Sequence, residues 1–550
     1  MCHKIAIWAS IARTQGPLTP ASLGIKNVML IQHHDVRRDC LIKAKWLVTI
    51  IVVTFGLAAV RSHAVSLEWS QQLGTSGDDT VHGVSADGSG NVYISGDSNG
   101  AFVSKYNDAG ALQWTSRLNA SFSRSVSADG LGNVYISGGT YGSLGGTNMG
   151  GVDAFIAKYN AAGELQWTKQ LGTTHSDESW GVSADGLGNV YLSGRTRGNL
   201  AGPIAGEQDA FIAKYNAAGE LQWTKQLGTV KSDGSFGVSA DELGNVYISG
   251  DTHGSLGDSF AGVVDVFVSK YDTSGILQWS RQLGTSTEDR NTGIASDGLG
   301  NAYVTGWTMG SLGAPLSGFT DAFVSKYDSA GEHQWTKQLG TDDYDVSDGV
   351  AADKLGNVYI TGWTYGSLGG PTNGGPEDAF VAKYSSEGVI QWKQQLGTGS
   401  TDEGGGVSAD GLGNVYISGS TKGGLSGLNM GGFDTFVTKY VEELAMPGDF
   451  DGDNVVDGKD FLAWQRDFGS TGSGLSTDGN GNGLIDADDL AIWQAEFGKT
   501  TVIGTPSQVP EPSMIAIAVT WLAGLCRWPQ LQMAWCSSQS ASAFSSRNRE

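Results

Sequence analysis

Cysteine is almost absent from this chain of 550 residues, and its few positions are informative. The four cysteines are Cys2, Cys40, Cys526 and Cys536, so residues 65–508 contain none. Disulfides therefore do not hold this region together, and a secreted form would rely on a large core or on bound metal. Proline is also scarce, with 11 residues, and no Gly-X-Y period runs through the 83 glycines, which excludes a collagen-like chain.

Basic residues are few compared with acidic ones. Residues 65–508 contain 23 lysines and arginines but 53 aspartates and glutamates. A surface of this charge repels phosphate backbones, so we expect no nucleic-acid partner. With 17 tryptophans and 39% apolar residues, the chain is not a disordered Gly/Ser tract. Glycine-rich turns between aromatic and β-branched segments favour a β-rich fold.

Residues 1–64 form an N-terminal extension that ends in a predicted secretory signal peptide. Four basic residues between positions 37 and 45 precede an apolar run, residues 46–60, and then the small-x-small pattern Ser62-His63-Ala64. The run is short for a membrane span, although an uncleaved anchor is the alternative. Met29 is a second candidate start. We therefore expect the remainder of the chain to be exported.

The middle of the chain is one repeat that occurs seven times, which decides the fold class. The segment N-x-Y-[IVL]-[ST]-G begins at Asn91, Asn133, Asn189, Asn245, Asn301, Asn357 and Asn414. The segment F-[IV]-x-K-Y begins at Phe102, Phe155, Phe211, Phe267, Phe323, Phe380 and Phe436. A tryptophan recurs at positions 69, 114, 167, 223, 279, 335 and 392.

Each copy consists of four short alternating segments separated by Gly, Asp and Asn turns. Four strands per copy without a helix predict an all-β, seven-bladed β-propeller over residues 65–440. Trp69 leads the array, and no tryptophan segment follows the last F-x-x-K-Y, so we expect the N-terminal strand to complete the last blade. The repeats resemble the SBBP family of bacterial β-propeller repeats, which implies the same architecture.

A more distant resemblance links the Gly163-to-Trp167 pattern to the propellers of quinone-dependent dehydrogenases. That resemblance implies a cofactor-stacking tryptophan, a metal and commonly a vicinal disulfide, but residues 65–508 have no cysteine. We interpret the repeated tryptophan as a packing residue between blades. The repeated acids that precede each copy, such as Asp177 and Asp233, are either a ring of calcium ligands or turn residues, and we favour turn chemistry.

One position varies between copies and marks a candidate ligand site. Directly after the N-x-Y-x-x-G segment stand Asp97, Gly139, Arg195, Asp251, Trp307, Trp363 and Ser420. Trp307 and Trp363 fall in successive copies, so they would lie in adjacent blades at one face of the propeller. There they would stack on a sugar ring or an apolar ligand, or simply pack against loops.

Residues 448–498, between the linkers 441–447 and 499–508, carry two acidic loops, each followed by an amphipathic helix. Both helices are expected to end at Phe-Gly, with Gly469 and Gly498 as the C-terminal glycines. Side-chain oxygens at loop positions 1, 3, 5, 9 and 12, with a backbone carbonyl at position 7, are what Ca²⁺ requires, and position 6 needs a sharp turn, which Gly483 or Asn454 would supply. Val456 and Ile485 at position 8 would pair the two loops. The predicted ligands of two calcium ions are Asp449, Asp451, Asp453, Val455, Asp457 and Asp460 in the first loop, and Asp478, Asn480, Asn482, Leu484, Asp486 and Asp489 in the second.

This duplicated arrangement resembles a type I dockerin domain. The resemblance implies a cohesin-like protein partner, contacted through loop positions 10 and 11. Those positions hold Gly458-Lys459 and Ala487-Asp488 rather than the usual Ser/Thr pair. A calcium-stiffened spacer is therefore the alternative interpretation.

Residues 509–550 resemble a PEP-CTERM sorting segment. Val509-Pro510-Glu511-Pro512 precedes an apolar stretch, residues 514–525, and then Arg527. The resemblance implies processing by an exosortase in the envelope of a Gram-negative-type bacterium, and hence an extracellular or envelope location. A single arginine stands where that family usually has a basic cluster, and a hydrophobic tail without function is the alternative.

Two functional hypotheses follow. The first is a secreted, non-catalytic surface protein, with the propeller as a ligand platform and the calcium module as a connector. The second is a polysaccharide-active hydrolase or lyase tethered by its dockerin-like module. An enzyme of that kind needs a unique acid or histidine cluster over the channel, and the near-identical copies predict none. The HExxH and P-loop patterns are also absent, so we assign no catalytic residue.

Overall fold

The computed structural model describes residues 65–241, 243–442, 448–451, 455–472, 475–479 and 483–499. The predicted signal peptide and sorting segment lie outside these residues. The described residues form 28 strands and two helices. No helix among them is long and apolar enough to cross a bilayer.

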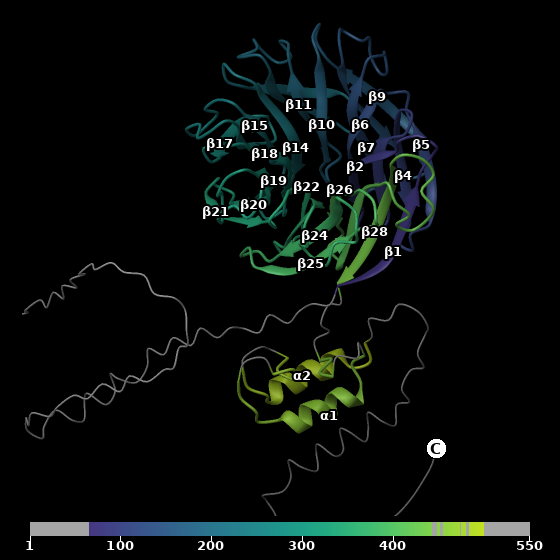
Figure 1. Ribbon diagram of the computed structural model, residues 1–550, viewed down its shortest axis with the longest axis vertical. Coiled ribbons are helices and arrows are strands. Elements are labelled where there is room, and N and C mark those ends of the chain that lie inside the picture. The colour runs from purple at the N-terminus through teal and green to yellow at the C-terminus, as the bar shows by residue number, and fades with distance from the viewer. Residues whose placement is uncertain are drawn as a thin grey trace, which may run out of the picture. The chain divides into compact units, whose positions relative to one another are not determined.

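The strands form seven four-stranded antiparallel sheets, which are the blades of a propeller (Figure 1). Blades 1 to 3 are β2 (Thr80–Ala86), β3 (Val92–Asp97), β4 (Ala101–Tyr106), β5 (Leu112–Arg117); β6 (Phe122–Ala128), β7 (Val134–Thr140), β8 (Asp153–Tyr159), β9 (Leu165–Leu171); and β10 (Asp177–Ala184), β11 (Val190–Thr196), β12 (Asp209–Tyr215), β13 (Leu221–Leu227). Blades 4 and 5 are β14 (Asp233–Ala240), β15 (Val246–Thr252), β16 (Asp265–Tyr271), β17 (Leu277–Leu283); and β18 (Asp289–Ser296), β19 (Ala302–Thr308), β20 (Asp321–Tyr327), β21 (His333–Leu339). Blades 6 and 7 are β22 (Asp345–Ala352), β23 (Val358–Thr364), β24 (Asp378–Tyr384), β25 (Ile390–Leu396); and β26 (Asp402–Ala409), β27 (Asn414–Thr421), β28 (Asp434–Glu442) and β1 (Val65–Leu73).

The N-terminal strand closes the ring, as the sequence predicts. β1 pairs antiparallel with β28, with Trp69 opposite Lys439 and Leu73 opposite Thr435. Blade 7 is thus built from both ends of the propeller. Because every blade is covered by two neighbours, closure leaves no blade with an unpartnered face.

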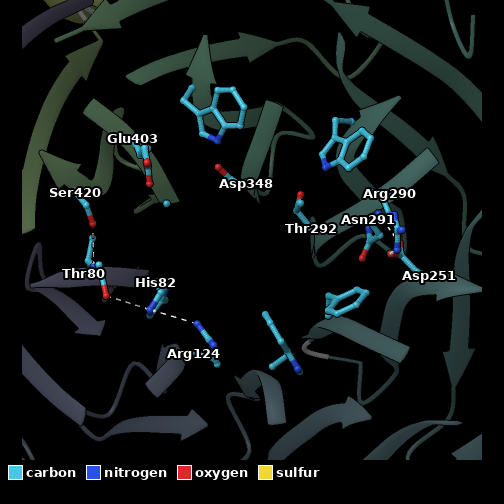
Figure 2. A pocket seen from close by; sticks show the side chains of 17 residues that line it. Thr80, His82, Arg124, Asp251, Arg290, Asn291, Thr292, Asp348, Glu403 and Ser420 are labelled. Carbon is cyan, nitrogen blue, oxygen red and sulfur yellow. Dashed lines mark hydrogen bonds and ion pairs between the residues drawn. The ribbon is translucent and has the colours of Figure 1, made fainter. Parts of the chain in front are cut away.

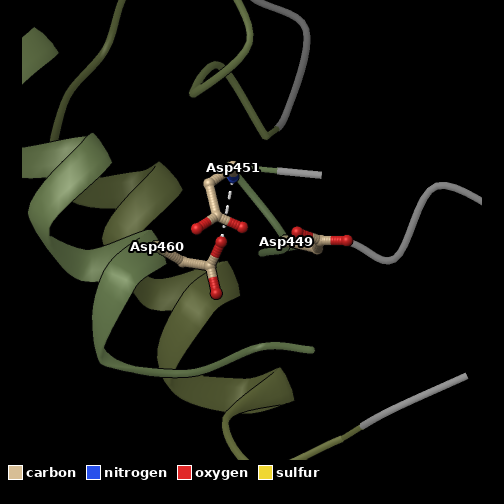
Figure 3. A group of neighbouring side chains, drawn as sticks. All are labelled: Asp449, Asp451 and Asp460. Carbon is tan, nitrogen blue, oxygen red and sulfur yellow. Dashed lines mark hydrogen bonds between the residues drawn. The ribbon is translucent and has the colours of Figure 1, made fainter. Parts of the chain in front are cut away.

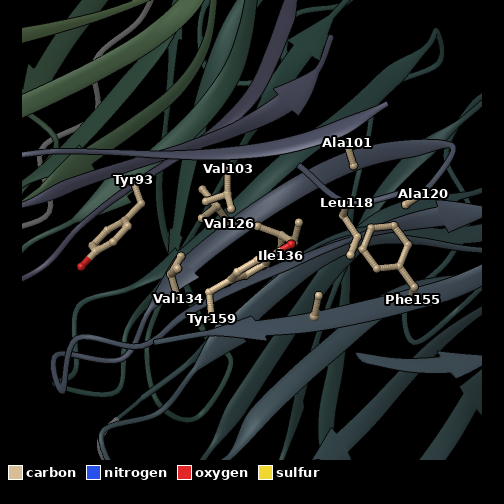
Figure 4. Close-up of a cluster of buried hydrophobic side chains, with 11 residues drawn as sticks. Tyr93, Ala101, Val103, Leu118, Ala120, Val126, Val134, Ile136, Phe155 and Tyr159 are labelled. Carbon is tan, nitrogen blue, oxygen red and sulfur yellow. The ribbon is translucent and has the colours of Figure 1, made fainter. Parts of the chain in front are cut away.

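The hydrophobic core lies between neighbouring blades. In the cluster of Figure 4, Tyr93 and Val103 of blade 1 pack with Val126, Ile136 and Phe155 of blade 2. The same arrangement recurs around the ring. The middle strands of each blade are buried on both faces, which explains their continuous runs of apolar and small residues.

The repeated tryptophan is a packing residue between blades, as expected. The ring centroids of Trp167 and Tyr135 in blade 2 lie 6.0 Å apart, and Trp167 Nε1 donates to the carbonyl of Ala217 in blade 3 at 3.2 Å. Gly219 follows in the same turn with φ +75°, and a Cβ there would lie 2.9 Å from the Trp167 ring. The glycine of each Gly-x-x-x-Trp pattern therefore packs against the tryptophan of the previous blade, and not against the tryptophan four residues later in its own pattern.

The described part of the C-terminal region contains two helices, α1 (Gly458–Asp467) and α2 (Ala487–Glu496). Each begins at an aspartate with a capping box, Asp457 and Asp486. Each is followed by Phe-Gly, with φ +83° at Gly469 and +86° at Gly498, which is the predicted glycine end of a helix.

The two helices pack through reciprocal tryptophan contacts. Trp464 Nε1 donates to the carbonyl of Asp486, and Trp493 Nε1 donates to the carbonyl of Asp457, both at 2.8 Å. The predicted pairing of Val456 with Ile485 is wrong. Val456 instead exchanges backbone hydrogen bonds with residues 498–499, and Ile485 with residues 469–470, so each loop pairs with the chain after the other helix.

Candidate functional site

The mouth of the propeller channel holds a cavity of about 510 Å³ (Figure 2). Its walls come from the first residues of the inner strand, which is the first strand of each blade, and from the last residues of the second strand. These strand ends lie next to the loops that join the fourth strand of one blade to the first strand of the next (the 4–1 loops) and the second strand to the third within a blade (the 2–3 loops). The cavity therefore lies at the face that the sequence predicts for ligand binding.

A β-bulge in each inner strand presents one residue to the channel. The register between inner and second strands shifts once per blade, for example between Ser179 and Gly181 in blade 3. The skipped residue, Trp180 in that blade, lines the channel, in line with the general use of bulges to re-aim a side chain. The seven bulged residues, called here the channel ring, are His82, Arg124, Trp180, Phe236, Thr292, Asp348 and Gly405.

No two members of the channel ring are alike, although the rest of the repeat is nearly identical from copy to copy. A seven-fold backbone carries an imidazole, a guanidinium, two aromatic rings, a hydroxyl and a carboxyl group around one axis. The signal was present in the sequence as one variable residue, two positions before the repeated valine or isoleucine of each copy. Alternation alone does not assign it to the channel, because the bulge changes which way the side chain points.

The variable position at the end of the second strands supplies the second part of the wall. Trp307 and Trp363 both line the cavity, as do Asp251 and Ser420. The predicted neighbouring tryptophans therefore share one cavity with the aromatic members of the channel ring. Trp180 and Phe236 of that ring are in edge-to-face contact, with centroids 5.3 Å apart.

Two carboxyl groups from neighbouring blades form the acidic side of the cavity. Burial, together with the charge of Glu403, raises the pKa of Asp348 to about 8. Burial also raises the pKa of Glu403, and Glu377 adds to this effect. At neutral pH the carboxyl group of Asp348 therefore carries its proton and can donate a hydrogen bond to a ligand.

A guanidinium group lies on the opposite side of the cavity (Figure 2). Arg124 is stacked on Phe122 and Trp180, with its Cζ 4.8 and 4.7 Å from the two ring centroids. Its Nη1 lies 3.4 Å from Nε2 of His82, and that nitrogen lies 3.3 Å from Oδ2 of Asp97. Burial lowers the pKa of Arg124. The aromatic stacking fixes the plane of the guanidinium and leaves it facing the channel.

A second arginine in the wall is neutralised by its own neighbours. Arg290 Nη1 donates to Asp251 at 3.0 Å, and Arg290 Nη2 lies 3.7 Å from Glu288. Burial raises the pKa of Asp251 to about 6, although Asn291 and Arg290 act against the shift. Arg290 and Asp251 therefore form part of the cavity wall, but their charges are compensated by each other and by Glu288.

The cavity thus combines aromatic faces with separated hydrogen-bonding groups. Stacking on an aromatic face suits the C–H face of a sugar ring, and carboxyl, hydroxyl and guanidinium groups suit its hydroxyls. The volume corresponds to a site for one or a few sugar rings rather than for a folded protein.

The repeated acids of the 4–1 links serve turn structure, as expected. Asp177 Oδ2 accepts hydrogen bonds from the backbone N–H and the hydroxyl of Thr173 at 2.6 and 2.8 Å, and the Thr196 hydroxyl donates to its Oδ1. Burial raises the pKa of Asp177. The contact to the threonine four residues earlier is shared by Asp79, Asp177, Asp233, Asp289, Asp345 and Asp402.

The first predicted calcium loop brings three of its carboxylates together (Figure 3). Ligand oxygens of Asp449, Asp451 and Asp460 all lie within 4.8 Å of one another. Asp460 Oδ1 also accepts the N–H groups of Phe450 and Asp451, at 2.7 and 3.0 Å, which fixes the loop against α1. A close set of hard oxygen donors fits a divalent cation such as Ca²⁺.

The remaining predicted ligands are only partly described. Val455 and Asp457 follow in the first loop, and Asp453 lies outside the described residues, as do Asn480 and Asn482 of the second loop. In the second loop, Gly483 has φ +80° and its N–H donates to Asp478 at 2.7 Å, which is the sharp turn expected at position 6. Asp486 caps α2, Asp489 completes its capping box, and Leu484 forms an isolated bridge with Thr471.

Comparison with known proteins identifies the repeat. Six segments match the family described as the SBBP beta-propeller repeat, at residues 68–102, 166–201, 222–257, 278–313, 334–369 and 391–426. The chain is a β-propeller repeat protein. Each matched segment starts in the last strand of one blade and continues into the next blade, where five segments end in the loop between the second and third strands and the segment 68–102 ends at the start of β4. The SBBP unit therefore spans parts of two blades.

Two curated relatives share part of the chain. The regulatory protein FlaEY of Caulobacter vibrioides is 26% identical over 282 residues, which cover 44% of this chain and 29% of that protein. The uncharacterized WD repeat-containing protein L264 of Acanthamoeba polyphaga mimivirus is 24% identical over 229 residues, 32% of this chain and 16% of that protein. The chain thus spans less than a third of the length of either relative.

One solved structure is also similar. It is the crystal structure of a protein of unknown function from Bacteroides caccae, with 13% sequence identity and a TM-score of 0.32, covering 60% of this chain and 94% of that one.

Proposed function

We propose that this chain is a secreted, non-catalytic binding protein of the cell surface or extracellular space, and that its propeller holds an extracellular polysaccharide at the channel mouth. The observation that carries this proposal is the single cavity wall shared by Trp180, Phe236, Trp307 and Trp363. Four aromatic side chains from blades 3 to 6 provide stacking faces. Arg124 and the acidic side chains provide polar contacts that orient a sugar.

The C-terminal module is proposed to bind two calcium ions and to connect the propeller to a partner. The grouping of Asp449, Asp451 and Asp460 supports a cation in the first loop, and the duplicated capping pattern supports a second. A cohesin-like partner would contact the first turns of α1 and α2, where Lys459 and Asp488 are exposed. The chain would be exported through its N-terminal signal and processed by exosortase-type machinery at residues 509–550.

A second candidate function is that of a polysaccharide hydrolase or lyase, and the pair Asp348 and Glu403 specifically favours it. A carboxyl group that keeps its proton at neutral pH can act as general acid toward a glycosidic oxygen. A neighbouring carboxylate can then act as base or nucleophile. Because both groups lie in the same cavity as the aromatic wall, a bound glycan would meet them.

A glycan array combined with product analysis tests both functions. The full chain is screened with calcium and with chelator, and bound glycans are then analysed for released reducing or unsaturated sugars. The proposal predicts binding without release, and binding lost in Trp307→Ala and Trp363→Ala. Release that disappears in Asp348→Asn and Glu403→Gln, while binding persists, would establish the enzyme instead. The absence of any glycan binding would contradict both functions.

A further inference from the structure

Blades 2 to 7 each fill a socket beside their outer strand with a leucine from their own 2–3 loop, whereas blade 1 does not. In blade 4, Leu256 is 6% exposed and packs with Ala210, Leu227 and Phe267. The corresponding loop residues are Leu144, Leu200, Leu256, Leu312, Leu368 and Leu425. Blade 1 joins β3 to β4 through residues 98–100 alone, in a tight turn in which Asn99 adopts φ +53°.

The filled sockets hold the loop backbone as well as the leucine. In blade 4, Leu256 N–H donates to the Gln282 side chain at 2.9 Å, and the Ser280 hydroxyl donates to the Leu256 carbonyl at 2.7 Å. In blade 2, Gln170 and Thr168 make the same two bonds to Leu144, at 2.8 and 2.9 Å. In all six sockets the leucine N–H donates to a glutamine side chain, and in blades 2 and 4 a hydroxyl also donates to the leucine carbonyl.

The same positions in blade 1 enclose an empty cavity of about 320 Å³. Leu73, Phe102 and Thr435 stand where blade 4 has Leu227, Phe267 and Ala210, and Thr115 and Arg117 stand where it has Ser280 and Gln282. Phe102, Thr115 and Arg117 of blade 1, together with Leu73 and Thr435 of the neighbouring blade 7, all line the cavity. Thr115 and Arg117 are exposed, whereas Ser280 and Gln282 are partly covered by their loop.

We propose that this cavity, called here the vacant socket, binds a leucine-bearing turn of a partner protein, with an acidic residue two positions after the leucine. The six filled copies define the backbone and the apolar side chain that the socket accepts. Burial of the leucine side chain is favourable, and the Thr115 hydroxyl can add a hydrogen bond to the leucine carbonyl.

The positive charge of Arg117 is the reason for expecting an acidic residue in the bound turn. A guanidinium has donors only, so it cannot accept the leucine N–H as glutamine does, and it favours a carboxylate. Arg117 forms no ion pair with another described residue, and it donates to the carbonyl and hydroxyl of Ser98. Blade 4 shows that a carboxylate reaches this position, because Asp258 Oδ2 accepts the N–H of Gln282 at 3.0 Å.

A peptide with the sequence of residues 252–264, the blade 4 loop, is the direct probe. We expect it to bind the full chain with one site per molecule in calorimetry. The Leu256→Ser peptide should bind the wild-type protein at least tenfold more weakly than the unchanged peptide does. The Asp258→Asn peptide should also bind the wild-type protein more weakly, whereas the Arg117→Gln protein should bind the Asp258→Asn peptide and the unchanged peptide equally well. Absent binding, or equal binding of the leucine and serine peptides, would overturn the proposal.

A loop graft provides a test within the fold. Residues 98–100 are replaced by a copy of residues 252–265, the equivalent segment of blade 4, and the matched control graft carries serine in place of the leucine. The leucine graft should raise the melting temperature above that of the serine graft and abolish peptide binding, while glycan binding at the channel is unchanged. Equal melting temperatures would overturn the assignment of the socket. If the wild type forms dimers and the leucine graft abolishes them, the occupant of the socket is a second copy of this chain. That result would contradict binding of another protein.

Discussion

Asp348 on β22 and Glu403 on β26 bring two carboxyl groups from neighbouring blades to the same side of the channel mouth, and their mutual repulsion favours a proton on Asp348. The backbone bulge of β22 presents Asp348 to the channel, whereas Glu403 lies two residues before the bulge of β26. The seven-fold frame thus produces a local chemistry that none of its individual repeats contains.

The first prediction concerns Asp348→Asn and the pH dependence of stability. The folded protein retains the Asp348 proton up to about pH 8, whereas an unfolded aspartate releases it near pH 4. A raised folded-state pKa contributes stability that is present at acid pH and is lost as pH rises through this window. We expect Asp348→Asn to match the wild type near pH 4 and to exceed it by several kcal/mol near pH 8.5, up to about 5 kcal/mol for a shift of about four pKa units.

Urea denaturation at several pH values measures this difference. Asp342→Asn, at an exposed residue of the neighbouring link, is the matched control and should show no such trend. A constant difference between Asp348→Asn and the wild type from pH 4 to 8.5 would show that Asp348 is ionised in the folded protein.

The second prediction concerns the glycine beneath each tryptophan. Gly163 has φ +78°, and a Cβ there would lie 2.6 Å from the ring of Trp114. Gly163→Ala should therefore lower the free energy of unfolding by about 2 kcal/mol or more, through strain and displacement of the tryptophan. Gly186→Ala is the control, because a Cβ at Gly186 meets no atom within 4 Å. Similar losses in the two variants would contradict this packing role.

The third prediction concerns ring closure. The Gln72 side chain of β1 donates to Asp434 at 2.9 Å and to the carbonyl of Gly423 at 3.1 Å, and it accepts the N–H groups of Leu425 and Ser426. Gln72→Ala leaves a buried carboxylate with fewer partners, so we expect a loss of about 2 kcal/mol.

The exposed Gln113 gives the matched control for closure. Its side chain bonds only to the nearby carbonyl of Ala111 among the described residues, so Gln113→Ala should stay within about 0.5 kcal/mol of the wild type. Thermal unfolding followed by tryptophan fluorescence compares the variants. An unchanged melting temperature in Gln72→Ala would show that β1 contributes little to closure.

The fourth prediction concerns calcium. Terbium replaces calcium at hard oxygen sites, and Trp464 and Trp493 lie in the module, so we expect tryptophan-sensitised terbium emission that calcium competes away. Asp449→Asn removes one carboxylate of the first loop and should halve the number of tight sites from two to one. Asp488→Asn, at an exposed residue outside the predicted ligand set, should keep both. Equal emission with and without Asp449 would contradict the assignment of the first loop.

Much of the fold is readable from the sequence because the repeat multiplies every local signal. Trp69 without a counterpart after Tyr440 predicts the closure of the ring, and Gly469 and Gly498 predict the ends of the two helices. The tryptophan near each outer turn, such as Trp167, is correctly assigned to packing. Each of these features is local or repeats seven times, so chance variation does not obscure it.

The channel ring could not be predicted in the same way. Whether Trp180 faces the channel or a neighbouring blade depends on one bulge, which shifts strand register by a single residue and leaves no turn residue as a signal. The position of Trp307 could be predicted because it directly follows the recognisable N-x-Y-x-x-G segment, near the end of β19. The relation between Asp348 and Glu403 spans two blades and depends on closure of the whole ring.

Calorimetric titration of the oligosaccharide that binds best on the array measures the affinity and stoichiometry of the channel-mouth site. We expect one site per molecule, with affinity reduced at least tenfold in Trp307→Ala and in Trp363→Ala, because each substitution removes a stacking face. Tyr141→Ala, which removes an exposed aromatic residue outside the cavity, should bind as the wild type does. Unchanged affinity in both tryptophan variants, or an equal loss in Tyr141→Ala, would contradict a glycan site at the channel mouth.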